Sequence, residues 1–284
     1  MKNLSRLILV FVAAAAMAGL CLGLSGCSLV NKLRAKNNLN EGVRDYNNGR
    51  YELAEGKFAF ALSLDPDNAN AQLFYARAIN AEFEAKQTPE LAQQAVDAYQ
   101  NLINHSENEP ASADKGLLFQ ANLYKEMAGL NPDKADQYKD KATEALLKRA
   151  ALPTATSDSK ATVYYTIGHD YWQSAYDLSK PFSKVNGARV DYSPDVATVA
   201  PKMKPLLTKA HEYLSKAIAE KPDYADAWVI QKLAYLQDSY IETDSNRRAE
   251  LAKLIDQCDK KARDLYDAQK QQAAQAEPAS STSK

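Results

Sequence analysis

The sequence predicts an all-α protein built from consecutive antiparallel helix pairs. Only 10 of its 284 residues are Gly, and the abundant Ala, Leu, Lys, Gln and Glu all favour helix. Apolar residues recur at helical spacing. Prolines separate these segments, and a proline ends one helix and can begin the next. The composition, 45% hydrophobic and 25% charged, is that of a globular protein and excludes disorder for most of the chain.

The first helix pair is expected at about residues 37–48 and 51–63. Small residues stand where the helices would cross, and one aromatic ring would fill the gap between them. These residues are Gly42, Ala54, Ala61 and Phe58. The Asp65-Pro66 step ends the second helix, because the proline ring disfavours helical geometry in the residue before it.

The same pattern returns in the second half of the chain. Four residues repeat the spacing of the helix at 51–63 and its closing proline, namely Ala210, Leu214, Ala217 and Pro222. The residues after the two prolines also agree. Two further pairs, at about 69–103 and 112–151, follow the pattern loosely.

A fifth pair begins at Trp228. Its long amphipathic second helix, from about residue 246, would close the array with Cys258 on its buried face. Gln, Ala, Ser and Thr dominate after it, so residues 271–284 are expected to be a disordered tail.

These offsets resemble the tetratricopeptide (TPR) repeat. Tyr164, Ile167, Gly168 and Tyr171 occupy the W-x-x-L-G-x-x-Y positions of the fourth pair, whereas Tyr46 stands one residue late in the first. The resemblance implies a TPR-like α-solenoid over residues 37–270, with about five antiparallel helix pairs in a right-handed superhelix. Proteins of this family mostly bind peptides or protein segments on a concave surface lined by the first helix of each pair.

The fourth pair carries an insertion at about residues 179–204. Asn186-Gly187 between Val185 and Val190 predicts a small hairpin there. A segment of this length inside a compact unit is usually functional or disordered, and a solvated loop is the plainer interpretation.

The N-terminal residues have the features of a secretion signal. Lys2 and Arg6 are basic, residues 7–24 form an uncharged apolar run, and Leu24-Ser25-Gly26-Cys27 follows directly. This resembles a bacterial lipoprotein signal, in which small residues precede the cysteine that becomes acylated. A plain secretory signal or a short membrane helix is the alternative, because such a run nearly spans a bilayer.

The lipoprotein resemblance implies a signal peptide at 1–26, palmitate and related acyl chains on Cys27, and a lipidated tether at 27–36. Ser28 after the cysteine is similar to lipoproteins sent to the outer membrane, facing the periplasm, if the host has two membranes. Residues Lys32, Arg34 and Lys36 of the tether could approach anionic lipid headgroups, although a solvated linker is the plainer interpretation.

An aromatic stripe marks the candidate partner-binding site. Four side chains fall at i, i+4, i+7 and i+11 on one face of the fourth pair's first helix: Tyr165, His169, Trp172 and Tyr176. Aromatic residues dominate many binding interfaces because they bury much area with few rotatable bonds. The alternative is that the insertion or a neighbouring helix covers this face.

Nothing in the sequence indicates an enzyme, a cofactor site or a metal site. His105, His169 and His211 lack paired spacing for a metal, and no serine elbow, phosphate-binding glycine loop or catalytic cysteine arrangement is present. The net charge is −1, or −3 once Lys2 and Arg6 are removed, which gives no general attraction for nucleic acid.

The sequence therefore predicts a lipid-anchored envelope protein that binds other envelope proteins or peptides, as a scaffold or assembly factor. The alternative function is that of a structural lipoprotein that self-associates through its terminal helix. A small-ligand or enzyme role would need a polar pocket beneath the insertion.

Overall fold

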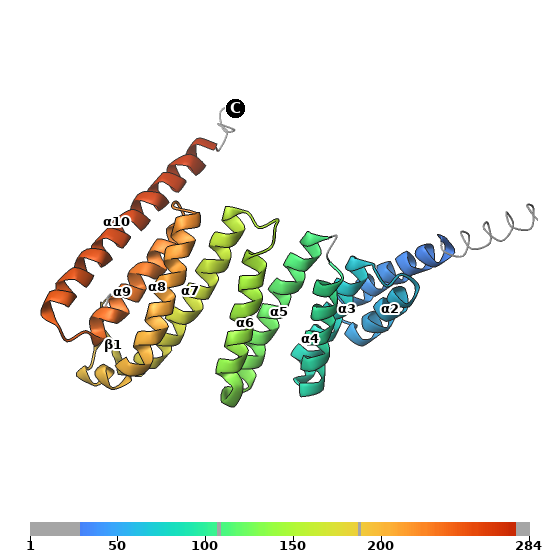
Figure 1. The fold of residues 1–284 in the computed structure, drawn as a ribbon, viewed down its shortest axis with the longest axis horizontal. Helices are drawn as coiled ribbons and strands as arrows, with labels where there is room; N and C mark the ends of the chain where they lie inside the picture. Colours follow the sequence, from blue (N-terminus) through green and yellow to red (C-terminus); the bar gives the residue numbers. More distant parts are fainter. Residues whose placement is uncertain (1–28, 107–108, 187–188, 277–284) are drawn as a thin grey trace, which may run out of the picture. The chain divides into compact units, whose positions relative to one another are not determined.

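The computed structural model describes residues 29–106, 109–186 and 189–276, and these residues are almost entirely helical. The chain divides into two compact units, Met1–Ala145 and Leu146–Lys284. In each unit, helices adjacent in sequence pack as antiparallel pairs (Figure 1). This confirms the all-α, TPR-like fold class. The right-handed superhelix stays a prediction.

The first unit begins with a helix over residues 29–47. Its further elements are α2 (Tyr51–Leu64), α3 (Ala69–Lys86), α4 (Pro89–Asn104), α5 (Pro110–Leu130) and the short η1 (Pro132–Lys134). The last helix, α6 (Ala135–Ala150), crosses the boundary between the units. Tyr124 of α5 stacks on Tyr138 of α6 with their ring centroids 6.4 Å apart.

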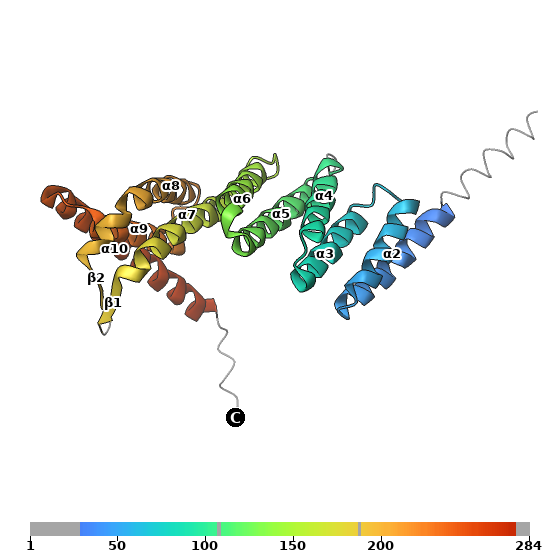
Figure 2. The same ribbon diagram turned by 90° about the horizontal axis from the view of Figure 1, so that it is seen from below.

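The second unit contains two helix pairs and the insertion (Figure 2). Its helices are α7 (Ser157–Ser179), α8 (Ala200–Glu220), α9 (Ala225–Ile241) and α10 (Ser245–Ala276). Between α7 and α8 lie η2 (Lys180–Phe182), β1 (Ser183–Asn186), β2 (Arg189–Tyr192) and η3 (Pro194–Val199). Strands β1 and β2 are antiparallel, with Val185 opposite Val190, which confirms the predicted hairpin.

The small residues lie where helices cross, as expected. Gly42 lies against the Phe58 ring, and a methyl group added at Gly42 would come within 2.6 Å of it. At the equivalent crossing, such a group on Gly168 would lie 2.7 Å from the Leu214 side chain. Both large side chains are fully buried. The two repeats are therefore built on the same close approach of helices.

The proline steps also act alike in both repeats. Helix α2 ends at Leu64, immediately before Asp65-Pro66. In each repeat, the side chain six residues after the proline donates a hydrogen bond to the backbone carbonyl of that proline. Gln72 Nε2 donates to the Pro66 carbonyl at 2.7 Å, and Trp228 Nε1 donates to the Pro222 carbonyl at 3.0 Å. The sequence agreement after the prolines thus corresponds to a shared helix entry.

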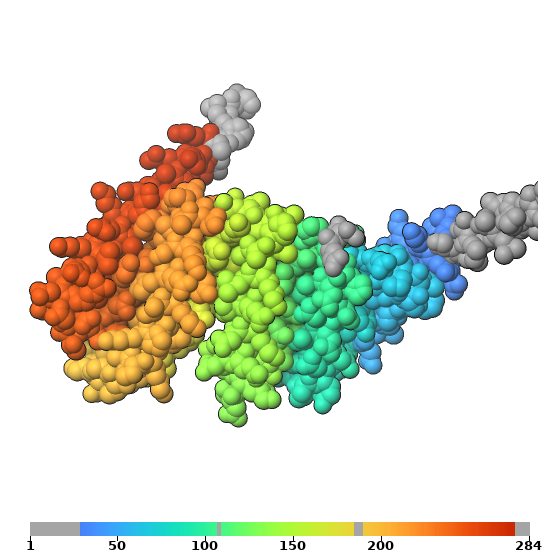
Figure 3. Space-filling view, in the orientation of Figure 1, coloured from blue at the N-terminus to red at the C-terminus, as the bar shows by residue number. Residues whose placement is uncertain are grey.

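Both ends of the repeat region extend further than expected. The N-terminal helix includes residues 29–36, which were expected to be a tether. Helix α10 continues to Ala276, past the expected start of the tail at residue 271. Its last turns project beyond the rest of the second unit (Figure 3), and their side chains are exposed.

The predicted signal peptide and Cys27 lie outside the described residues, so lipidation stays a prediction. Within residues 29–276, the described helices include none that is both long enough and apolar enough to cross a bilayer.

Candidate functional site

The four residues of the predicted stripe form a continuous aromatic row along α7. Thr156 caps the start of this helix, since its hydroxyl accepts a hydrogen bond from the Ser159 backbone N–H at 3.2 Å. Successive ring centroids are 6.0, 5.4 and 5.7 Å apart from Tyr165 through His169 and Trp172 to Tyr176. All four side chains are partly buried.

The Tyr165 end of the row is covered by neighbouring side chains. The Tyr165 ring lies 5.0 Å from the Tyr224 ring, measured between centroids. Burial raises the pKa of the Tyr165 hydroxyl, and the nearby Asp226 carboxylate raises it further. This end of α7 is therefore occupied by the start of α9.

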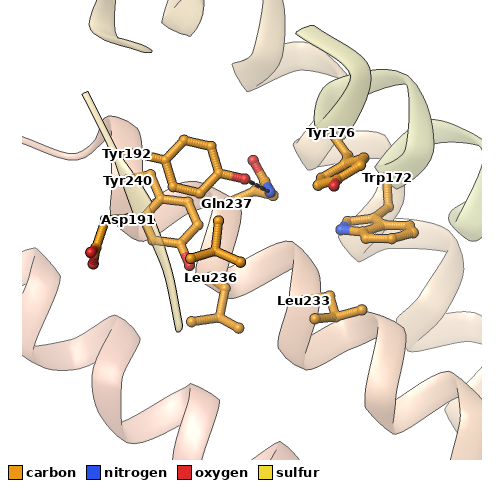
Figure 4. Close-up of a pocket in the computed structure, with 9 residues that line it drawn as sticks. Trp172, Tyr176, Asp191, Tyr192, Leu233, Leu236, Gln237 and Tyr240 are labelled. Carbon is orange, nitrogen blue, oxygen red and sulfur yellow. Dashed lines mark hydrogen bonds between the residues drawn. The ribbon is translucent and has the colours of Figure 1, made fainter. Parts of the chain in front are cut away.

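The Trp172 end of the row opens into a pocket of about 560 Å³ (Figure 4). Three elements line it: α7, β2 of the insertion and α9. The lining residues are Trp172, Tyr176, Val190, Asp191, Tyr192, Leu233, Leu236, Gln237 and Tyr240. Helices α7 and α9 are the first helices of their pairs, and β2 of the hairpin forms the third wall of the pocket.

A chain of hydrogen bonds fixes the walls of the pocket. The Ser179 hydroxyl, fully buried at the end of α7, has two acceptors within hydrogen-bond distance, Gln237 Oε1 at 2.8 Å and the Tyr176 carbonyl at 2.9 Å. Gln237 Nε2 in turn donates to the Tyr192 hydroxyl at 3.2 Å. Tyr192 also stacks on Tyr240 with ring centroids 4.1 Å apart. One buried network thus joins α7, α9 and the hairpin.

One polar group at the pocket has no protein partner. Trp172 Nε1 is buried and lacks a hydrogen-bond acceptor among the described residues. In Figure 4 the nitrogen edge of this indole is turned toward the pocket. A buried N–H without an acceptor is unfavourable by about 1–3 kcal/mol. This nitrogen has almost no accessible surface, so an acceptor reaches it only if the indole or a neighbouring side chain moves.

The insertion is a wall of the pocket and not a free loop. Val196 of η3 is buried, and Phe182, Tyr192 and Val199 pack against the core of the second unit. The insertion therefore packs on the repeat, and its strand β2 lines the same pocket as Trp172 and Tyr176. The interpretation of this segment as a solvated loop holds for its basic side chains, since Lys180, Lys184, Lys202 and Lys204 are exposed. Its apolar side chains instead pack on the repeat, because they have a surface to bury against.

Sequence reasoning located part of the pocket. The structure brings Trp172 and Tyr176 into it and leaves Tyr165 and His169 outside its lining. The other seven lining residues were not among the predicted site residues, and three of them, Tyr192, Gln237 and Tyr240, hold the walls together. They come from segments far apart in sequence, and the only sequence signal for them was the presence of an unusual insertion.

A second aromatic cluster, also missed, lies in the first unit. The guanidinium carbon of Arg77 in α3 is 5.1 Å from the Tyr46 ring centroid, 5.5 Å from that of Phe74 and 5.3 Å from that of Phe119. The rings belong to the first helices of three successive pairs. Each cation–ring contact is favourable, so Arg77 connects these helices. In the sequence, the one indication of this cluster was Tyr46, which stands one residue later than the TPR pattern requires.

The histidines outside the stripe take part in local contacts. His211 Nε2 lies 2.7 Å from Asp238 Oδ2, its Nδ1 lies 2.8 Å from Gln231 Nε2, and its ring stacks on Tyr235. This arrangement joins α8 to α9. In the part of the chain that the structure describes, no three His, Cys, Asp or Glu side chains gather as metal ligands would.

Sequential helix pairs with small residues at their crossings define a TPR-like repeat protein. No model of a known protein family matches the sequence, and no curated protein matches it. Among solved structures, one crystal structure of MamA is similar at 17% identity and a TM-score of 0.47, covering 86% of this chain and 96% of that one. A second MamA structure has 17% identity and a TM-score of 0.43, with 81% and 96% covered.

Proposed function

We propose that this protein is a lipid-anchored envelope protein that binds a segment of another envelope protein in the pocket beside Trp172. One observation carries the proposal: two first helices, α7 and α9, meet the hairpin at an aromatic pocket whose buried indole N–H lacks an acceptor. Aromatic side chains around a partly desolvated hollow are typical of interface hot spots.

The pocket fits a peptide segment with an apolar side chain. Its lining is mostly aromatic and aliphatic, and Asp191 is the one charged residue among the lining side chains of the described chain. A peptide backbone would supply a carbonyl oxygen to Trp172 Nε1 once the indole turns on binding, while a large apolar side chain would contact Leu233 and Leu236. The same volume falls in the range of small-molecule sites, so a small apolar ligand is the competing occupant.

The anchor rests on the N-terminal sequence. Lys2, Arg6, the apolar run and Cys27 together have the order of a lipoprotein signal. Several acyl chains on Cys27 would give durable attachment. In a host with two membranes, we propose the outer membrane, with the repeats facing the periplasm.

Site-specific photocrosslinking in the native envelope tests the binding proposal. A photoreactive residue at Leu236, which lines the pocket and leaves Trp172 in place, should give a discrete crosslinked species, which mass spectrometry identifies as a protein partner. The control is a photoreactive residue at Lys216, an exposed position of α8. No crosslink at 236, a crosslink only within the chain, or the same products from both positions would contradict the proposal.

Two substitutions separate binding from folding. Trp172→Phe keeps a ring in the partly buried position and removes the N–H, so it should weaken the crosslinked species with little change in the melting temperature. Tyr164→Phe, on the other aromatic face of α7, is the matched control and should leave capture unchanged. Loss of capture in both variants would instead indicate a general disturbance of α7.

Self-association through α10 is not favoured by its packing. Leu251, Cys258 and Ala262 of this helix are buried, and the helix packs on α9 (Figure 1). The apolar face that the alternative requires is thus already used within the second unit.

A further inference from the structure

The first two turns of the N-terminal helix carry large apolar side chains that are exposed. Leu29, Val30 and Leu33 are 64%, 54% and 56% exposed. The Phe60 ring of α2 is exposed as well, and the Arg34 guanidinium lies 6.0 Å from its centroid. We name these four apolar residues, 29, 30, 33 and 60, the N-terminal apolar patch.

The patch faces away from the protein. Ala35, in the next turn, is 1% exposed and belongs to a core cluster with Ala61 and Ala71. A helix turns by about 100° per residue, which places Leu29 and Leu33 on the side opposite Ala35. The side chains of Leu29, Val30 and Leu33 therefore have no contact with the core that would explain their apolar character.

Basic residues border the patch on both sides. By the same rotation, Lys32 and Lys36 fall on one side of the Leu29–Leu33 row and Arg34 falls on the other. All three are exposed, and no acidic residue occurs among residues 29–40. An outward apolar arc with Lys and Arg at its borders is the pattern of helices that lie in the plane of a membrane interface.

The patch also lies next to the proposed anchor. Leu33 is six residues after Cys27, and six residues span at most about 20 Å even when fully extended. If the acyl chains of Cys27 lie in the bilayer, the first two turns of the helix stay within reach of the lipid headgroups.

We propose that the N-terminal apolar patch docks on the lipid surface, with Leu29, Val30 and Leu33 among the acyl chains and the three basic side chains at anionic headgroups. This inference rests on the lipid anchor of the proposed function. The occupant is a bilayer and not a second protein, because the flanking charges complement anionic lipid and long basic side chains can extend to the headgroups while their stems remain apolar.

Docking would attach the protein to the membrane at a second point, in addition to the acyl chains on Cys27. One lipid anchor leaves a protein free to rotate, whereas a helix held in the interface fixes the direction in which the first unit leaves the membrane. The patch therefore orients the first unit, in addition to strengthening attachment.

Tryptophan fluorescence of the full lipidated protein in vesicles tests this inference. Leu33→Trp places a reporter in the patch. Leu53→Trp is the matched control, because Leu53 is 61% exposed and lies near the start of α2, the end remote from residue 33. The vesicles contain phosphatidylcholine and phosphatidylglycerol, with or without bromine on the acyl chains, and the signal of the parent protein is subtracted.

We expect brominated lipid to quench the emission of the Leu33→Trp reporter and to leave that of Leu53→Trp unchanged. Replacing Lys32, Arg34 and Lys36 with Gln should reduce the quenching. Equal or absent quenching at the two positions would overturn the inference. A blue shift at residue 33 that depends on protein concentration, without quenching, would overturn it in favour of a second copy.

The mass of the N-terminal peptide distinguishes the two proposals. Acyl chains on Cys27 without quenching at residue 33 would overturn this inference alone. Absence of acylation would overturn the lipid anchor and this inference together. Partner capture in the pocket is measured separately, by the crosslink at residue 236, and tests neither the acylation nor the patch.

Discussion

Gly168 of α7 packs directly against Leu214 of α8, so that an added methyl group would lie 2.7 Å from Leu214 Cγ and 3.0 Å from its backbone nitrogen. The contact therefore includes main chain, which cannot move aside as the end of a side chain can. Gly42 and Phe58 form the corresponding contact in the first unit, where the neighbour is an aromatic ring. The approach of the two helices in the first pair and in the fourth pair depends on these two glycines.

Gly168→Ala should therefore destabilise the second unit. Overpacking of a filled helix contact typically lowers the free energy of unfolding by about 1–3 kcal/mol. Gly56→Ala is the control, because Gly56 is an exposed position of α2 with nothing within 4 Å, and Ala there should stabilise the helix by about 0.5–1 kcal/mol. Thermal unfolding followed by circular dichroism measures both; a neutral or stabilising Gly168→Ala would contradict the proposed contact.

Ser179→Ala should loosen the hairpin wall of the pocket. The substitution leaves the buried Gln237 Oε1 without its donor, which is unfavourable by about 1–3 kcal/mol. We expect faster proteolytic cleavage within residues 183–192. Ser183→Ala serves as the control, since the Ser183 hydroxyl donates only within its own turn, to the Lys180 carbonyl. Equal cleavage rates in the two variants would show that the network does not hold the hairpin.

The Cys258 thiol should be unreactive in the folded protein. Burial raises its pKa to about 11, so at about pH 8 only a small fraction is thiolate, the form that alkylating reagents attack. Iodoacetamide labelling, measured on the peptide that contains Cys258, should be slow until the protein is unfolded. A cysteine introduced on the same helix by Ser245→Cys, an exposed position, should react quickly. Fast native labelling of Cys258 would show that α10 detaches readily from α9.

The contact between Tyr266 and Asp226 should weaken at high pH. The Tyr266 hydroxyl donates a hydrogen bond to the Asp226 carboxylate, and this bond, followed by burial, raises the pKa of Tyr266 to about 12. A folded-state pKa above the unfolded value of about 10 means that the stabilisation is complete below about pH 10 and is lost as the pH rises through about 12.

Comparison of the parent protein with Tyr266→Phe isolates this contribution from the other groups that titrate in the same range. The difference between their melting temperatures should be constant below about pH 10 and should shrink above it. If the difference in melting temperature did not change with pH, ionisation of the Tyr266 hydroxyl would have no effect on the stability of the protein.

The helix crossings were predictable because their sequence requirement is local and repeated. A glycine or alanine where two helices meet, and a large residue beside it, leave fixed offsets such as Ala54, Phe58 and Ala61. The hairpin was predictable for a related reason, since Asn186-Gly187 has the local chemistry of a tight turn. Both ends of the domain were misjudged, because helix boundaries in residues 29–36 and 271–276 carry no proline or glycine stop.

The pocket could not be predicted beyond Trp172 and Tyr176. Its other walls depend on where β2 and α9 lie, and the contacts that place them are Ser179 with Gln237 and Gln237 with Tyr192. These pairs are 58 and 45 residues apart, and no period in the sequence relates them. Periodicity identified the aromatic face of α7, whereas tertiary hydrogen bonds decide which part of that face stays open.

The position of the hairpin within a repeat has an evolutionary consequence. Helices α7 and α8 are held together by Gly168 and Leu214, so the connection between them can change in length while the pair stays intact. The entropy of closing a loop grows only logarithmically with its length, by about 0.6 kcal/mol for each doubling. Substitutions and insertions in evolution could therefore replace residues 183–192, and so change the β2 wall of the pocket, while the pair of α7 and α8 stays intact.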